Sequence, residues 1–177
     1  MTIDRLITAV PPPAVPSEPF RGRWEPIEVA LGTPLPPDYK DFARLYGGGT
    51  LFDFMYVQTP RTADGGTQFA RWVGEICRSW GHMERETPTV YWPAPGGLLP
   101  FGYSMDGDYF FWLTSGPPEA WRVAVWDRGG FEGENVETFD RDFTDFLAGI
   151  AAGDLVSTTL PDDLLECDPL FKPAWQG

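Results

Sequence analysis

The chain has 177 residues, a hydrophobic content of 42% and an aromatic content of 15%. This composition excludes a generally disordered chain and is typical of one globular domain that buries its own core. The formal net charge of −13 at pH 7 argues against binding to nucleic acid or to an anionic membrane, because both require a cationic surface. The sequence shows neither a membrane span nor a signal peptide, so we expect a soluble cytoplasmic protein.

The two ends of the chain differ in composition from its centre. Residues 11–19 read PPPAVPSEP, and five prolines in nine residues cannot form a helix or an interior strand. We therefore predict a Pro-rich extended N-terminal arm over residues 1–19 and a domain over residues 20–155. The acidic tail, residues 156–177, contains three prolines and no clear period. We expect it to pack on the domain or to extend from it.

Helical periodicity and capping signals predict four helices. The first spans residues 24–31, with Pro26 near its start and Gly32 just after its end. A second opens at Pro36-Pro37 and ends at the glycines 47–49. The third, over residues 67–80, carries an apolar stripe at spacings of three and four residues, which indicates a core helix. The fourth is capped by Asp140 or Asp142 and ends at Gly153.

Runs of aromatic and β-branched residues predict the strands. Residues 109–114 and 121–126 form the central antiparallel ribbon, with a tight turn at Asp106-Gly107 before it. Further strands are expected at residues 51–57, 89–92 and 136–139. The order of elements predicts an α+β fold: a single domain in which a central, mainly antiparallel sheet is flanked by helices, gathered on one side.

The sequence offers no assembled catalytic set. The only histidine is His82, and Cys77 and Cys167 do not have the spacing of metal ligands, so we expect no metal and no cofactor. We predict that the protein is not an enzyme. Asp106 and Asp108 leave an alternative open, because paired carboxylates could act on a glycan or hold a divalent cation. Asp-Gly-Asp is also what a tight turn favours, and we prefer that interpretation.

Acidic residues are concentrated in the last quarter of the chain. Residues 131–177 contain eleven Asp and Glu against only Arg141 and Lys172, so this segment carries −9 of the net −13. A one-signed surface steers association with an oppositely charged partner, and aromatic anchors with a polar rim suit a protein interface. The alternative for each acid is a solvated loop or helix face. We predict a partner-binding surface on Glu132, Glu134, Glu137, Asp142 and Asp145.

The order of several short motifs resembles one protein family. The pattern W-x-x-I-E-x-x-L-G-x-x-L-P-x-D-Y-K-x-F-x-x-x-Y-G-G-G is carried from Trp24 to Gly49. The block GLLPFG at residues 97–102 follows, then Asp-Gly-Asp, Phe111-Trp112, Trp121 and a closing F-x-x-F-L element. Together these motifs are similar to the SUKH superfamily, the Smi/Knr-like group, over roughly residues 24–155.

The resemblance implies an α+β domain that binds another protein. Bacterial members of the family are largely immunity proteins, which neutralise a cognate toxin of a polymorphic toxin system, often a nuclease or deaminase. Fungal members regulate cell-wall synthesis and signalling. The chain contains eleven Arg and two Lys, a composition that favours a bacterial source. We therefore expect an immunity protein that binds a basic toxin domain, with a regulatory or scaffolding domain without a toxin as the alternative.

Overall fold

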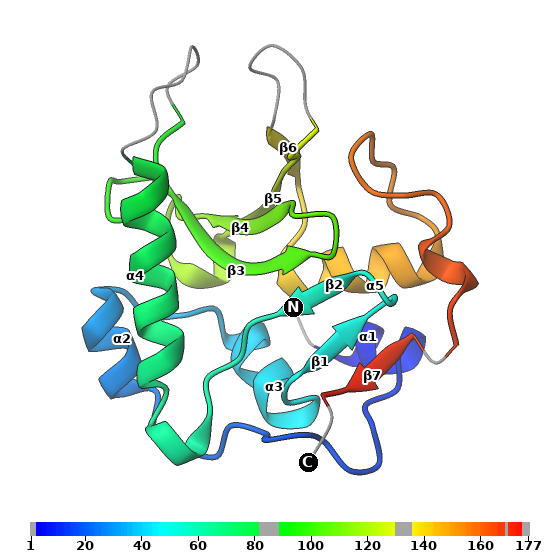
Figure 1. The fold of residues 1–177 in the computed structure, drawn as a ribbon, viewed down its shortest axis with the longest axis horizontal. Helices are drawn as coiled ribbons and strands as arrows, with labels where there is room; N and C mark the ends of the chain where they lie inside the picture. Colours follow the sequence, from blue (N-terminus) through cyan, green and yellow to red (C-terminus); the bar gives the residue numbers. More distant parts are fainter. Residues whose placement is uncertain (1–2, 82–88, 130–135, 169, 175–177) are drawn as a thin grey trace.

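The computed structural model describes residues 3–81, 89–129, 136–168 and 170–174. Within these residues, seven strands form one antiparallel sheet in the order β6-β5-β4-β3-β2-β1-β7. The two edge strands are therefore β6, which precedes the last described α-helix in the sequence, and β7, which is the last described strand of the chain (Figure 1). In chain order the strands are β1 (Gly49–Leu51), β2 (Met55–Val57), β3 (Leu98–Ser104), β4 (Tyr109–Leu113), β5 (Arg122–Trp126), β6 (Val136–Phe139) and β7 (Phe171–Pro173).

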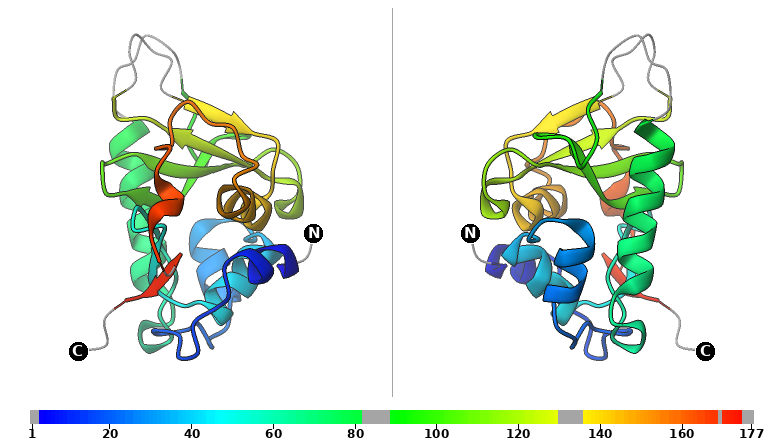
Figure 2. Two further views of the ribbon diagram at one scale, coloured as in Figure 1. Left: turned by 90° about the vertical axis from the view of Figure 1, so that its right-hand side faces the viewer. Right: turned by 90° about the vertical axis from the view of Figure 1, so that its left-hand side faces the viewer.

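Helices cover both faces of this sheet. The long helix α4 lies on one face, whereas α1, α3 and α5 lie on the other (Figure 2). The expectation that helices gather on one side was therefore wrong, because β4 buries Phe110 on one face and Phe111 on the other. Both faces then need an apolar cover. The α-helices are α1 (Asp4–Ala9), α2 (Glu25–Leu31), α3 (Pro37–Leu45), α4 (Thr67–Gly81) and α5 (Phe143–Ala152), with short 3₁₀ turns at Thr62–Asp64, Pro118–Ala120 and Leu164–Glu166.

The capping signals act as the sequence predicts. Proline occupies the first turn of α2 and of α3, where a missing N–H costs little. Gly32 and Gly153 end α2 and α5 in the left-handed conformation, with φ of 76° and 68°. The cap of α5 is Asp142, whose side chain accepts a hydrogen bond from the Asp145 N–H. The predicted positions of these four helices are confirmed to within a few residues.

Two predicted strands differ in the structure. The run 51–57 is interrupted, because Phe52 and Asp53 adopt positive φ (58° and 51°) and turn the chain between β1 and β2. The run contains no glycine or proline, and Asp53 is its single residue of a type that favours turns, so the local signal for the turn was weak. Residues 89–92 form only an isolated bridge from Tyr91 to Leu98. The predicted strands of the central ribbon and of residues 136–139 are confirmed.

Both ends of the chain take part in the fold. Residues 4–9 form α1 where an extended arm was expected, and Leu6 and Val10 are fully buried. The Tyr46 hydroxyl donates a hydrogen bond of 2.6 Å to the Val10 carbonyl. In the tail, Phe171 is buried and β7 pairs with β1. The division at residues 19/20 and 155/156 therefore separates regions of different composition that share one core.

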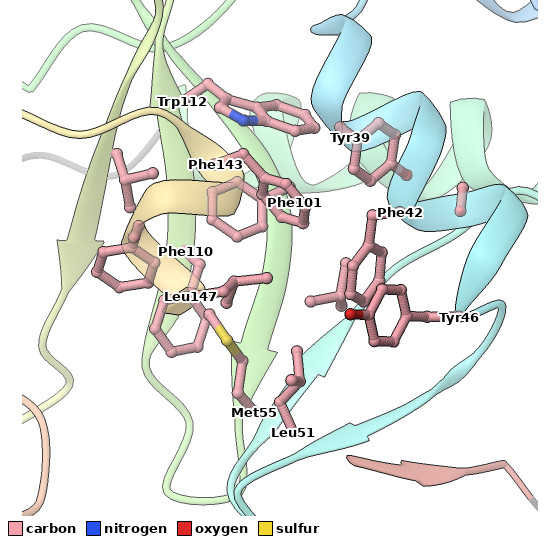
Figure 3. Packing of buried hydrophobic residues seen from close by; sticks show 14 of the residues in the cluster. Tyr39, Phe42, Tyr46, Leu51, Met55, Phe101, Phe110, Trp112, Phe143 and Leu147 are labelled. Carbon is pink, nitrogen blue, oxygen red and sulfur yellow. The ribbon is translucent and has the colours of Figure 1, made fainter. Parts of the chain in front are cut away.

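The core between the sheet and α3 and α5 is built largely from aromatic rings (Figure 3). Tyr39 of α3 meets Trp112 of β4 and Phe143 of α5 edge to face, with ring centroids 4.9 and 5.4 Å apart. Phe101 of β3 lies 4.8 Å from Trp112. Edge-to-face pairs add specific geometry to the burial of large apolar surface. This packing fixes how the sheet and its helices sit against each other.

Candidate protein-interaction surface

The structure describes three of the five predicted partner-binding acids. Glu132 and Glu134 lie outside the described residues. Glu137 lies on β6, and Asp142 and Asp145 lie at the start of α5. All three have intramolecular partners, which decides how freely each charge can act on another protein.

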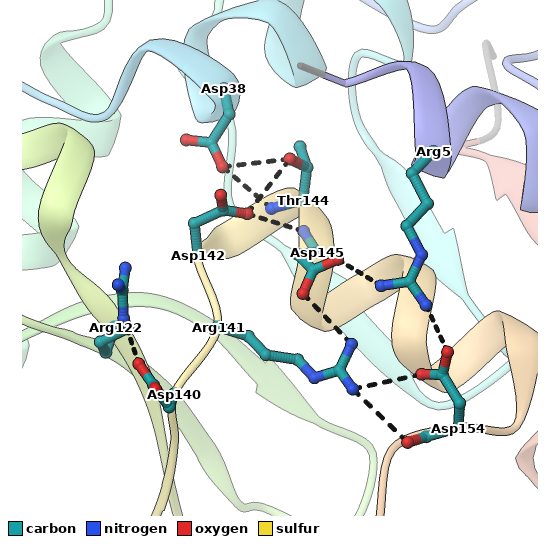
Figure 4. Close-up of polar contacts among 9 residues, drawn as sticks. All are labelled: Arg5, Asp38, Arg122, Asp140, Arg141, Asp142, Thr144, Asp145 and Asp154. Carbon is teal, nitrogen blue, oxygen red and sulfur yellow. Dashed lines mark hydrogen bonds and ion pairs between the residues drawn. The ribbon is translucent and has the colours of Figure 1, made fainter. Parts of the chain in front are cut away.

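Asp142 is buried, with only 5% of its surface exposed, and it caps α5. Its Oδ1 accepts a hydrogen bond of 2.8 Å from the Asp145 N–H. Asp38, at the start of α3, accepts bonds from the Thr144 N–H (2.9 Å) and the Thr144 hydroxyl (3.2 Å) (Figure 4). Burial raises the pKa of Asp38, and the nearby charge of Asp142 raises it further. Asp38 therefore joins the start of α3 to the start of α5, which Asp142 caps.

Asp145 belongs to a closed ring of four charged side chains. Arg5 of α1 contacts both Asp145 and Asp154, and Arg141 contacts the same two carboxylates at 3.1 and 3.4 Å (Figure 4). Two guanidinium groups and two carboxylates balance each other in charge. The ring ties α1 to both ends of α5, and the charge of Asp145 is largely compensated within the molecule.

Glu137 holds the chain that follows α5. Its carboxylate accepts hydrogen bonds from the Ser157 hydroxyl (2.6 Å), the Thr158 N–H (3.0 Å) and the Thr159 N–H (3.3 Å). Burial opposes the charged form of Glu137, but these hydrogen bonds outweigh it and the pKa of the carboxyl is lowered. The partners lie some twenty residues away in sequence, so sequence reasoning had no signal for this role.

The Asp-Gly-Asp motif closes the turn between β3 and β4. Asp108 is buried and accepts hydrogen bonds from the Ser104 hydroxyl (2.7 Å) and the Arg128 N–H (3.1 Å). Gly107 has a φ of 93°, which a residue with a side chain rarely adopts. Asp106 is exposed. These contacts favour the turn interpretation over a catalytic carboxylate pair, because Asp108 is already engaged in holding the turn.

The cysteines give no sign of a metal site or a nucleophile in the part of the chain that the structure describes. Cys77 is buried, and burial raises its pKa to about 11, so its thiol is neutral at pH 7. His82 lies outside the described residues. Within the described ranges, no group of three or more His, Cys, Asp and Glu side chains is arranged to hold a metal ion. Nor does any helix of this part of the chain have the length and apolar character to cross a membrane.

One row of side chains, which we call the cross-strand row, crosses all seven described strands on the sheet face that also carries α4. The strand registers place these residues directly opposite one another, from one edge of the sheet to the other. Every member is partly exposed. From β7 to β6 the row consists of Lys172, Thr50, Tyr56, Tyr103, Tyr109, Trp126 and Val136.

The four central members of this cross-strand row are aromatic. Tyr56 stacks on Tyr103 with ring centroids 5.2 Å apart, and Tyr103 lies 6.3 Å from Tyr109. Trp80 of α4 packs against Tyr109 and Trp126 at 4.7 and 4.6 Å, so α4 covers one end of the row. Mutual stacking restricts the rings before any partner binds. Rigid aromatic side chains with a polar hydroxyl suit a protein interface, since little entropy is lost on contact.

The surface is hollowed beside the other end of the cross-strand row. A hollow of about 410 Å³ is lined by Tyr56, Gln58, Arg61 and Lys172 among others. A second, of about 250 Å³, lies between Gln58 and α4. The sequence predicts β4 and β5 from their aromatic content, but it does not give the register that aligns side chains from distant strands. The sequence alone therefore does not predict the row.

Comparison with known proteins gives one match. Residues 21–147 match the family model SUKH_6, described as SMI1-KNR4 cell-wall. No curated protein and no solved structure shows significant similarity to the chain. The match spans well over half of the chain and includes every strand from β1 to β6. The α+β sheet with its flanking helices agrees with what the resemblance implied. The chain therefore belongs to the SUKH superfamily, in the SMI1-KNR4 group.

Proposed function

We propose that the protein is a non-enzymatic immunity protein, which binds a cognate toxin domain and neutralises it by occlusion. The family match over residues 21–147 is the observation that carries this proposal. The family is consistent with immunity or with cell-wall-related roles, and the Arg-rich, Lys-poor composition favours the bacterial branch. Three groups that could act in catalysis have other roles here. Asp142 caps α5, Asp108 holds the β3–β4 turn, and the Cys77 thiol is buried and neutral, which supports a binding role over catalysis.

The cross-strand row is the surface that we assign to the toxin. Hot spots of protein interfaces are enriched in Tyr and Trp, and they lie where packing is rigid and water can be excluded. Tyr56 and Tyr103 meet this description, since they stack on each other and Tyr56 borders a hollow in the surface. Docking here would place the body of the immunity protein over the toxin and block access to its active site.

The net charge supports a partner with a basic surface, such as a nuclease or deaminase domain. Glu132, Glu134 and Glu137 remain proposed steering charges. Asp142 and Asp145 were predicted as well. Because Asp142 caps α5 and Asp145 pairs with Arg5 and Arg141, we expect both to contribute mainly to the net charge. The same charge disfavours direct contact with nucleic acid. Long-range attraction would raise the association rate more than the final affinity.

A regulatory or scaffolding domain without a toxin is the second candidate. It is favoured by the description of the matching family, which refers to the cell wall. The same cross-strand row would then bind a cellular partner. The two candidates differ in the gene context that they require, because an immunity protein is encoded beside its toxin.

Co-expression provides the test. The toxin domain encoded beside this chain is expressed in a bacterial host with and without the full chain. We expect growth arrest by the toxin alone, growth when both are present, and a stable complex in size-exclusion chromatography. Continued arrest in the presence of well-folded chain would contradict the immunity role. A gene neighbourhood without a toxin would favour the regulatory candidate.

A further inference from the structure

A groove of about 790 Å³ lies between α2, α4 and the segment 89–94. This volume falls within the range of small-molecule sites, roughly 300–1,000 Å³. Figure 1 shows α2 beside α4, with the chain returning past the end of α4 toward β3. The lining is mainly apolar and includes Leu31, Val73, Gly74, Cys77, Val90 and Trp92.

The walls of this groove are held in place by hydrogen bonds. The Trp92 indole N–H donates to the Leu31 carbonyl at 2.9 Å, which joins the segment 89–94 to the end of α2. The Trp92 N–H donates to the Leu98 carbonyl at 3.1 Å, and the Leu98 N–H donates to the Val90 carbonyl at 2.9 Å. The groove is therefore preformed, and a ligand would not have to order it.

Gly74 leaves space on the α4 side of the groove. A Cβ built on Gly74 meets no described atom within 4 Å, other than its own helix backbone and chain neighbours. Val73 and Cys77, its neighbours on α4, are buried. The opening at Gly74 therefore leads onto an apolar floor, where a hydrocarbon chain would be removed from water.

Among the described residues that line the groove, Arg78 is the one with a charged side chain. Within the described ranges it forms no ion pair, whereas Arg71, two turns earlier on α4, pairs with Glu75 at 3.3 Å. Arg78 is exposed in the last turn of α4, where a positive charge is favoured by the helix dipole, so its guanidinium is open to a ligand at the rim of the groove. An apolar groove with one cation at its rim complements a ligand that has an apolar body and a single negative charge.

We propose that this groove binds a small amphipathic carboxylate of the medium-chain fatty acid class. The hydrocarbon chain lies over Val73, Gly74 and Cys77, and the carboxylate pairs with the Arg78 guanidinium. The other described lining residues are uncharged, so Arg78 determines the orientation of the ligand. The groove and the cross-strand row share no residue, so ligand binding in the groove does not require the proposed toxin interface.

Isothermal titration of the full chain with decanoate, below its micelle concentration, tests the proposal. We expect saturable binding at one site per chain, with octanoate binding several-fold more weakly because two fewer methylenes are buried. Arg78→Gln should weaken decanoate binding about tenfold and leave decanol binding unchanged, since decanol lacks the charge. Arg71→Gln, on the same helix but outside the groove, should bind decanoate as the wild type does.

A second variant tests the apolar part of the groove. Gly74→Leu projects a side chain into the open space and should abolish binding of both decanoate and decanol. Thermal unfolding provides the fold control, and we expect a midpoint at least equal to that of the wild type because glycine disfavours helix. Absence of decanoate binding to the wild type would overturn the proposal. So would many weak sites per chain, or equal binding by the wild type, Arg78→Gln and Gly74→Leu.

Discussion

At the residue scale, Asp142 caps α5 from a buried position. We expect Asp142→Ala to lower the free energy of unfolding by about 1 kcal/mol, the usual cost of a lost N-cap. Asp142→Asn should cost less, because it keeps an acceptor oxygen for the Asp145 N–H and removes the charge beside the buried Asp38. Urea unfolding measures both variants. An equal loss of unfolding free energy in the two variants would mean that Asp142 stabilises the protein through its charge and not through the capping hydrogen bond.

Glu137 makes stability depend on pH in a defined direction. Its pKa is lowered in the folded protein, so the folded state binds fewer protons than the unfolded state near that pKa. The stability that it contributes is present above its unfolded pKa of about 4.3 and is lost as pH falls through the folded pKa.

Glu137→Gln should therefore flatten the loss of stability between about pH 5 and pH 3, and lower stability at pH 7 by about 0.5–1 kcal/mol. Urea unfolding at a series of pH values provides the measurement. Asp106→Asn is a matched control, because it removes one exposed carboxyl at the β3–β4 turn. A pH profile of Glu137→Gln that overlays the wild type would contradict the role of the hydrogen bonds from Ser157 and Thr158.

At the scale of elements, α1 is attached to the domain in two ways. Arg5 contributes to the charged ring, and Leu6 is fully buried. Partly exposed ion pairs contribute about 0–1 kcal/mol, whereas loss of a buried leucine side chain costs about 2–5 kcal/mol. We expect Leu6→Ala to destabilise the protein clearly more than Arg5→Ala in urea unfolding. The opposite order would show that the charges, and not burial, hold α1.

Two helical glycines allow a matched comparison. Gly74 of α4 has free space around an added Cβ, whereas the same atom at Gly149 of α5 would lie 2.9 Å from the Arg141 guanidinium. Replacement of glycine by alanine within a helix favours the helix by up to about 1 kcal/mol at both positions. Gly74→Ala should therefore raise the unfolding midpoint, and Gly149→Ala should gain less because it displaces a member of the charged ring. Equal gains would show that Arg141 moves aside without cost.

At the scale of the whole molecule, the cross-strand row and the net charge make different contributions to the proposed complex. Tyr56→Ala combined with Tyr103→Ala should weaken binding of the toxin at least thirtyfold, the effect of losing about 2 kcal/mol at a hot spot. Val156→Ser, at an exposed position after α5, should leave affinity unchanged. Surface plasmon resonance measures both. Unchanged affinity in the double variant would show that the toxin binds another surface, and it would not contradict the immunity role.

The association rate tests the net charge. If the −13 charge steers a basic partner, raising the salt concentration from 50 to 500 mM should slow association by tenfold or more and change dissociation little. Stopped-flow mixing gives both rates. An association rate that does not change with salt would remove electrostatic steering from the proposal.

The sequence by itself determined the family, the fold class and the four helices between residues 24 and 153, because motif order, helical periodicity and capping residues are encoded locally. Only the tertiary structure decided that α1 and β7 complete the fold, because their burial depends on contacts with distant elements. It also decided the partners of Asp145 and Glu137. The cross-strand row depends on register among strands from residue 49 to residue 173, and no local pattern carries that information.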